Sequence, residues 1–269
     1  MASAPSCPSS MKTSEAMKVK DIARALEEFA PLQDQEHWDN AGLCVGSPED
    51  EVHRVLVGFD CTRQLVEEAV SLGADMIVTH HPLIFNGLKR IAPDDPVGGA
   101  VYMAIRHGIA IYAAHTNADK AQGGVNELMV QRLGLLDAAP LDESRLGFIG
   151  RLPEPLGGEA FCALVKERFG LQLLRCSAPV ATVRRVATSC GAGAGFAELA
   201  FASGADAFVT GDVSYHRFLV PDGHMIVDIG HFESEVDIVA KFVSVLQEKL
   251  PTFAVCTTTQ KNNNPIYYY

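Results

Sequence analysis

The chain has 269 residues and a formal net charge of −11, from 22 Lys and Arg against 33 Asp and Glu. This acidic balance argues against a nucleic-acid backbone as the main partner, while 48% hydrophobic and 20% charged residues are typical of a globular protein. The length allows about two domains or one large one.

The first 16 residues contain no apolar core segment and no arginine, which argues against a signal or transit peptide. We therefore expect a disordered leader over residues 1–16. No run reaches the eighteen or so apolar residues that a membrane span needs, so we expect a cytoplasmic protein without a membrane partner. The seven cysteines contain no C-x-x-C pair, which argues against a zinc ribbon or a redox dithiol, and we expect them to be reduced.

The chain contains an internal repeat with a constant offset of 131 residues. The segment from Arg54 to Phe85 aligns without a gap on the segment that begins at Arg185. Each copy predicts a strand, a turn, an amphipathic helix that ends in Gly, and a second strand. We therefore expect two duplicated α/β halves, 17–140 and 141–269, with mainly parallel sheets covered by helices and a metal site between the halves.

Polar residues follow the predicted strand ends in both halves. His80 and His81 follow one strand; the strand at 109–114 runs into His115 and Asp119, and the strand at 225–230 runs into His231 and Glu235. The carboxyl ends of parallel strands are where open α/β sheets place their ligand sites. Within a regular strand two adjacent imidazoles point to opposite faces, so a turn at the strand end or two points of attachment must resolve the conflict.

These six side chains offer imidazole nitrogen and carboxylate oxygen and no thiolate. A single catalytic zinc takes three protein ligands and water, so five or six ligands favour a dinuclear site with ions roughly 3.5–4 Å apart. Zn, Fe, Mn and Co all suit such ligands. One histidine at a strand end is more often structural than a metal ligand. Here histidines follow three strands at equivalent ends of the duplicated sheets, and this favours a metal site.

Several other residues keep two interpretations open. Gly191, Gly193 and Gly195 form either a tight structural turn or a contact to a substrate phosphate. Asp60 either caps a helix or serves the site, and Trp38 packs in the core or lines the metal cleft. Asp212 stands where the first half has its histidine pair, and one interpretation is that it orients a ligand or the substrate. His216, near it, is interpreted equally well as a surface or capping residue. Four histidines have no partner pattern and are interpreted as structural or solvated: His37, His53, His107 and His224.

Five segments resemble the signature blocks of one family: WDNAGLCVG from Trp38, VTHHPLIF from Val78, AHTNAD from Ala114, TGDVSYH from Thr210 and GHFESE from Gly230. The chain is similar to the Nif-three-like family, whose members are named GTP cyclohydrolase I type 2 homologs, over Met17 to about Tyr267. The resemblance implies a duplicated α/β fold, a dinuclear metal centre and a homohexamer. Only residues 141–185 separate the halves, which implies the compact form without a large inserted domain.

Carried over residue by residue, the resemblance implies the metal ligands His80, His81, Asp119, His231 and Glu235. His115 is placed in the second coordination shell or as a further ligand, and His115 and Asp212 are the candidate catalytic residues. The implied function is a dinuclear metal-dependent hydrolase that uses a metal-bridging hydroxide. Its small-molecule substrate is unknown, with a nucleotide such as GTP or a phosphoester as candidates. The alternatives are a metal-binding regulatory or protein-interaction scaffold and a metal store.

Overall fold

The computed structural model describes residues 16–259 and 264–267. Its contacts divide the chain into two compact units. Unit 1 takes the residues up to Ala121 together with Ile238–Pro265, and unit 2 takes Gln122–Asp237 together with the residues from Ile266 onwards. These units differ from the predicted halves 17–140 and 141–269 at two places, since residues 122–140 belong to unit 2 and Ile238–Pro265 belongs to unit 1. Residues 1–15 of the expected leader lie outside the described residues.

Unit 1 is built on a five-stranded sheet with the order β13-β4-β5-β6-β2. Neighbours are parallel from β13 to β6, and only β2 runs antiparallel, against β6. The strands of the sheet are β2 (Gly42–Val45), β4 (Arg54–Val57), β5 (Met76–Thr79), β6 (Ala110–Ala113) and β13 (Ala254–Thr257). A separate antiparallel pair joins β1 (Met17–Lys18) to β3 (Glu51–Val52).

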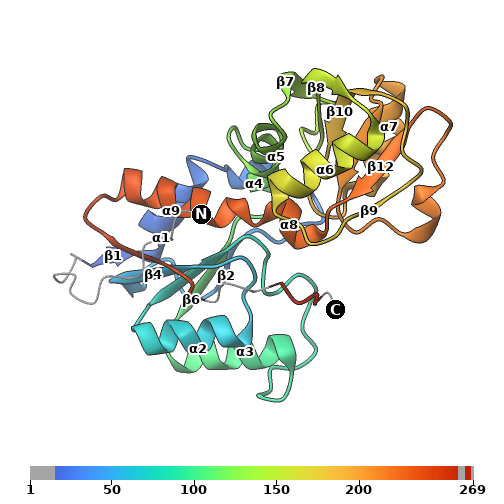
Figure 1. Cartoon of the computed structure of the whole chain (residues 1–269). Coiled ribbons are helices and arrows are strands. Elements are labelled where there is room, and N and C mark those ends of the chain that lie inside the picture. Colours follow the sequence, from blue (N-terminus) through green and yellow to red (C-terminus); the bar gives the residue numbers. More distant parts are fainter. Residues whose placement is uncertain (1–15, 260–263, 268–269) are drawn as a thin grey trace. The chain divides into compact units, whose positions relative to one another are not determined.

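Helices cover both faces of the unit 1 sheet, as Figure 1 shows. On one face, α2 (Arg63–Leu72) and α3 (Pro96–Arg106) bury Leu65 and Ala104 against Ile77 of β5 and its neighbours. On the other lie α1 (Val19–Glu27) and α9 (Asp237–Lys249), where the rings of Phe29 and Phe242 meet edge to face at 6.5 Å. Apolar residues on both faces explain why these strands are continuously hydrophobic. The unit is completed by the 3-10 helix η1 (Leu32–Asp34) and the short helix α4 (Thr116–Lys120).

Unit 2 contains a six-stranded sheet with the order β7-β8-β10-β11-β12-β9. Only the central strands β10, β11 and β12 are parallel, and the flanking strands β8, β7 and β9 run antiparallel. The predicted α/β fold is thus confirmed, with a sheet of mixed direction in this unit. The strands are β7 (Leu136–Pro140), β8 (Phe148–Leu156), β9 (Arg175–Cys176), β10 (Val183–Thr188), β11 (Ala207–Thr210) and β12 (Met225–Asp228).

In unit 2, small residues bring α7 (Ala197–Ala202) close to the sheet. Ala197 and Ala200 of α7 pack on Phe208 and Ile226, and Phe161 and Val165 of α6 are fully buried. Residues 141–185 form β8, α6, β9 and the start of β10, and no further domain. The helices are α5 (Val125–Leu133), α6 (Gly158–Phe169), η2 (Gly193–Phe196), α7 (Ala197–Ala202), η3 (Tyr215–Phe218) and α8 (His231–Glu235).

The duplication is visible in matching hydrogen bonds. In unit 1, the Asp75 carboxylate accepts the backbone N–H groups of His53 and Arg54 at 2.7 and 3.2 Å. In unit 2, the Asp206 carboxylate accepts those of Arg184 and Arg185, both at 2.8 Å. Each residue of the second set lies 131 positions after its counterpart. An aspartate before the second strand of each copy therefore holds the start of the first strand.

The expectation of reduced cysteines agrees with the structure at five positions, since Cys44, Cys61, Cys162, Cys176 and Cys190 are free thiols. Cys7 lies outside the described residues. Among the helices that the structure describes, none has both the length and the hydrophobicity required to cross a membrane.

Replacement of Asp75 by Ala is expected to lower the free energy of unfolding by about 1–3 kcal/mol, because two backbone N–H groups lose their acceptor. Denaturant titration of the two proteins measures this difference. The matched control is Asp94→Ala, since the Asp94 side chain is 73% exposed and its carboxylate pairs only with Arg90, at 3.5 Å. Equal stability of the Asp75 and Asp94 variants would contradict this account of the repeat.

Candidate metal centre

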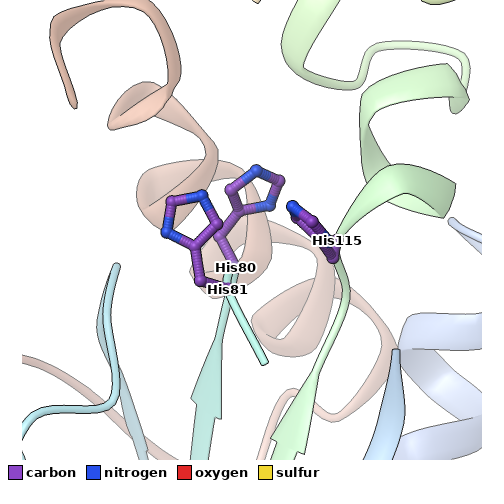
Figure 2. A group of neighbouring side chains, drawn as sticks. All are labelled: His80, His81 and His115. Carbon is purple, nitrogen blue, oxygen red and sulfur yellow. The ribbon is translucent and has the colours of Figure 1, made fainter. Parts of the chain in front are cut away.

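Three histidines of unit 1 gather at the carboxyl ends of β5 and β6, as Figure 2 shows. The two strands pair in parallel with Thr79 opposite Ala113, so the residues that follow them emerge side by side. The ring centroids of His80 and His81 lie 4.9 Å apart, and each lies 5.3 Å from the ring of His115. Ring nitrogens of the three histidines come within 4.8 Å of one another. The spacing is suitable for metal coordination.

A turn at the end of β5 brings both adjacent imidazoles to the same place. The strand ends at Thr79, and the N–H groups of His80 and His81 both donate to the Phe59 carbonyl, at 3.1 and 3.4 Å. The Thr79 hydroxyl donates to the His81 carbonyl at 2.9 Å. The alternating directions of a regular strand therefore do not apply to this pair.

The Nδ1 atoms of His80 and His81 are each fixed by an oxygen. Nδ1 of His80 lies 2.9 Å from the Ala114 carbonyl, and Nδ1 of His81 lies 2.7 Å from the Asp60 carboxylate. A carbonyl only accepts hydrogen bonds, so Nδ1 of His80 carries the proton and, in the neutral ring, Nε2 carries the lone pair. Acceptors on the distal nitrogen orient metal-binding histidines in this way. Asp60 therefore positions His81.

His115 is oriented by Asp39, a carboxylate 76 residues earlier in the chain, at 2.7 Å. The Asp39 side chain is fully buried, and it also accepts the backbone N–H and the hydroxyl of Thr116. Burial by itself raises the pKa of Asp39, but the hydrogen bonds from His115 and Thr116 outweigh it and lower the pKa to about 2. Asp39 is therefore ionised at neutral pH. No local pattern in the sequence connects Asp39 to His115.

Asp119 completes the set of predicted site residues in unit 1. It lies on α4 and is buried, and its Oδ1 faces Nε2 of His80 at 3.5 Å. The Asn117 side chain fixes this helix, since its amide donates to the Ala30 carbonyl and its oxygen accepts the His115 N–H. An imidazole lone pair and a carboxylate oxygen that face each other form an arrangement that a shared cation stabilises.

Unit 2 contains a matching arrangement on α8. Nδ1 of His231 lies 2.8 Å from the Asp212 carboxylate, and Nε2 lies 3.0 Å from the Glu235 carboxylate one turn later. Glu235 is only 4% exposed. The two helices differ in register, because His231 is the first residue of α8 whereas His115 precedes α4. Asp212 thus positions a histidine, the role that Asp60 and Asp39 have in unit 1.

The Gly-rich turn of unit 2 lies against these residues. Gly191 has a φ of +55°, and a Cβ there would come within 2.3 Å of the Glu235 carboxylate. A Cβ on Gly193 would come within 2.2 Å of the Ser189 hydroxyl, and the Gly191 N–H already donates to Ser234. Close packing accounts for these two glycines, which favours the structural interpretation of the turn.

Trp38 lies beside His115 and not in the core. It is 52% exposed, and its ring centroid lies 6.1 Å from Phe85 and 6.4 Å from His115, both edge to face. Phe85 is itself 47% exposed. The Asn40 side chain, two residues after Trp38, donates to the Ile84 carbonyl and connects the two loops. This aromatic pair borders the histidine cluster of unit 1, as the second interpretation of Trp38 required.

The histidines without a partner pattern make other contacts. His224 binds the Ala205 carbonyl through Nδ1 at 2.9 Å and stacks on Phe201, and His53 lies 3.6 Å from Asp75. His216 is exposed on η3. These positions agree with structural or solvated roles.

Comparison with known proteins identifies the family. The model of Duf34/NIF3 (NGG1p interacting factor 3) matches residues 17–265. The chain belongs to the Duf34/NIF3 family. It is 33% identical to a GTP cyclohydrolase 1 type 2 homolog of Clostridium perfringens, over 94% of this chain and 100% of that protein. A homolog of the same name from Streptomyces coelicolor is 36% identical over 81% of each chain.

A solved Duf34/NIF3 structure supports the fold. The Bacillus cereus protein related to NIF3 superposes with a TM-score of 0.86 at 25% identity and covers 95% of this chain and 100% of its own. The resemblance drawn from the sequence segments and the predicted fold class are therefore confirmed. The length match agrees with a compact member of the family.

Replacement of Gly191 by Ala is expected to lower the free energy of unfolding by ~1–3 kcal/mol, because it strains the backbone and displaces Glu235. Denaturant titration measures the effect. Gly195→Ala in the same turn is the control, since no atom lies within 4 Å of a Cβ there. If both variants are as stable as the unaltered protein, Gly191 is not required by close packing.

The chain contains one tryptophan, so Trp38 emission reports on the histidine cluster of unit 1. Titration with Co²⁺ is expected to quench this emission to saturation, since the ring centroid lies 6.4 Å from that of His115 and a paramagnetic ion nearby quenches indole. His81→Ala should raise the Co²⁺ concentration at the midpoint of the titration at least tenfold. Saturating Co²⁺ that leaves the emission unchanged would argue against metal binding at this cluster.

Proposed function

We propose that this protein is a metal-dependent hydrolase with two divalent ions per chain. The observation that supports the proposal most strongly is the anchoring of four histidines through Nδ1, which makes Nε2 the atom of each ring that can bind a metal ion or a proton. The proposed ligands are His80, His81 and Asp119 of unit 1 and His231 and Glu235 of unit 2.

The number of donors supports two ions over one. Five nitrogen and oxygen donors exceed the three that a catalytic zinc takes from the protein, and a pair of ions uses them all. Oxygen and imidazole donors suit Zn, Fe, Mn or Co. When bound, two such ions acidify water and neutralise negative charge that develops on a substrate oxygen or nitrogen.

The residues of the chain have distinct roles in this proposal. Asp60 and Asp212 accept the Nδ1–H of His81 and His231 and so hold those rings in one orientation. His115 is the proposed catalytic residue: with Nδ1 on ionised Asp39, its Nε2 can take up a proton from water or return one to a leaving group. Asp39 stabilises the charged ring in that step.

The proposed substrate is a small molecule that carries an ester or ring bond open to hydrolysis, as in a nucleotide or a phosphoester. The relatives named GTP cyclohydrolase 1 type 2 homologs support a nucleotide. A cytoplasmic location and a homohexamer complete the proposal.

A scaffold that binds partners is the second candidate. Tyr215 and Leu219 on and after η3 are 78% and 76% exposed, and large exposed apolar side chains are typical of protein contacts. The family description, NGG1p interacting factor 3, also names an interaction. A scaffold would keep its partner contacts when the metal ligands are replaced, whereas an enzyme would lose turnover.

Elemental mass spectrometry of protein purified without chelator or nickel resin should find about two ions per chain. His231→Ala should lose at least one ion, and Asp212→Ala should weaken metal affinity about 10–100-fold, because it removes only the acceptor that orients His231. His216→Ala, which removes an exposed histidine of the same unit, should retain both ions. Folded protein that takes up no Zn, Mn, Fe or Co would refute the hydrolase proposal and favour the scaffold.

A further inference from the structure

Unit 1 contains a cavity of about 600 Å³ that reaches the proposed metal ligand His81. Its lining comes from the β4–α2 turn with the start of α2, from the turn after β5, from the first turn of α3 and from Pro265 near the C-terminus. These are the carboxyl ends of two parallel strands, where α/β sheets hold their ligands. Small-molecule sites occupy about 300–1,000 Å³, so the cavity has the size for a metabolite such as a nucleoside monophosphate.

One side of the cavity is apolar and rigid. Pro82 and Leu83 follow His81, and Pro96 and Val97 start α3. Asp95 caps this helix by accepting the N–H groups of Val97 and Gly98, at 3.1 and 2.7 Å. Proline rings and a capped helix end do not reorganise, so this wall presents a preformed surface for a flat or apolar group.

The lining also carries a positive charge. Arg63 at the start of α2 is the cation among the described lining residues. Its guanidinium is held by Glu67, at 3.1 Å from Nε, and by the Pro93 carbonyl, at 3.2 Å from Nη1. A guanidinium has five N–H donors, so the remaining ones are available to an anion. The Asp60 carboxylate, which also lines the cavity, is bonded to His81.

We propose that this cavity binds an organic anion with a planar ring, of the class of a nucleoside phosphate. The ring packs on Pro82, Leu83 and Val97, and the anionic group pairs with Arg63. If the proposed hydrolase function holds, the part of the substrate that reacts lies at the end of the cavity that His81 occupies. Arg63 is then a specificity residue for the anionic group, and Val97 is a specificity residue for the ring.

The test is equilibrium binding of GMP and guanosine to the full chain by isothermal titration calorimetry, with the metal content of every sample measured separately. Val97→Trp fills the cavity from the start of α3 and should weaken the binding of both ligands at least tenfold. Arg63→Gln should weaken GMP about tenfold and leave guanosine within twofold, because only GMP carries the charge. Ile105→Trp, on an exposed position of the same helix α3, is the control and should bind as the unaltered protein does.

The inference is overturned if the unaltered protein binds neither ligand at millimolar concentration, or if Val97→Trp binds both unchanged. If Arg63→Gln weakens the binding of GMP and of guanosine equally, Arg63 does not recognise the charge of the ligand. Failure of the proposed hydrolase function would give a different result. The samples would then lack metal or turnover, while GMP binding would still be weakened by Val97→Trp and Arg63→Gln and unchanged by Ile105→Trp.

Discussion

The parallel pairing of β5 with β6 is the constraint on which the rest of unit 1 depends. Thr79 lies opposite Ala113, so the chain leaves both strands at the same edge of the sheet, and His80 and His115 follow within two residues. The same edge receives the β4–α2 turn with Asp60, because β4 pairs in parallel with β5 on its other side. Three neighbouring strand ends thus supply histidines, an orienting carboxylate and the wall of a cavity.

Carboxylates determine how these histidines can act. An imidazole without a partner on Nδ1 can exchange tautomers and rotate, and it then presents no defined lone pair. Asp60, Asp39 and Asp212 each remove this freedom from one ring, and the Ala114 carbonyl does so for His80. Ionised Asp39 shows how the fold maintains such an acceptor in a buried place: hydrogen bonds from His115 and Thr116 offset the cost of desolvation.

The two copies of the repeat have diverged at their strand ends while keeping the same frame. Asp75 and Asp206 hold the strands in the same way, yet His80 and His81 of unit 1 correspond to Gly211 and Asp212 of unit 2. A Cβ on Gly211 would come within 2.8 Å of the backbone at Gly191, Gly230 and His231, so that position excludes a second histidine. The strand end that carries the proposed ligands His80 and His81 in unit 1 therefore carries a positioning carboxylate, Asp212, in unit 2.

The sequence by itself determined the repeated strand-helix-strand pattern, the family and the strand ends at which the site residues occur. These features are local, because the hydrophobic period and the turn residues of each segment specify them. The tertiary structure alone decided that β13 pairs with β4 in unit 1 and that the flanking strands of unit 2 run antiparallel. It also decided that Asp39 orients His115 across 76 residues. Such contacts depend on the path of the intervening chain, which no local pattern records.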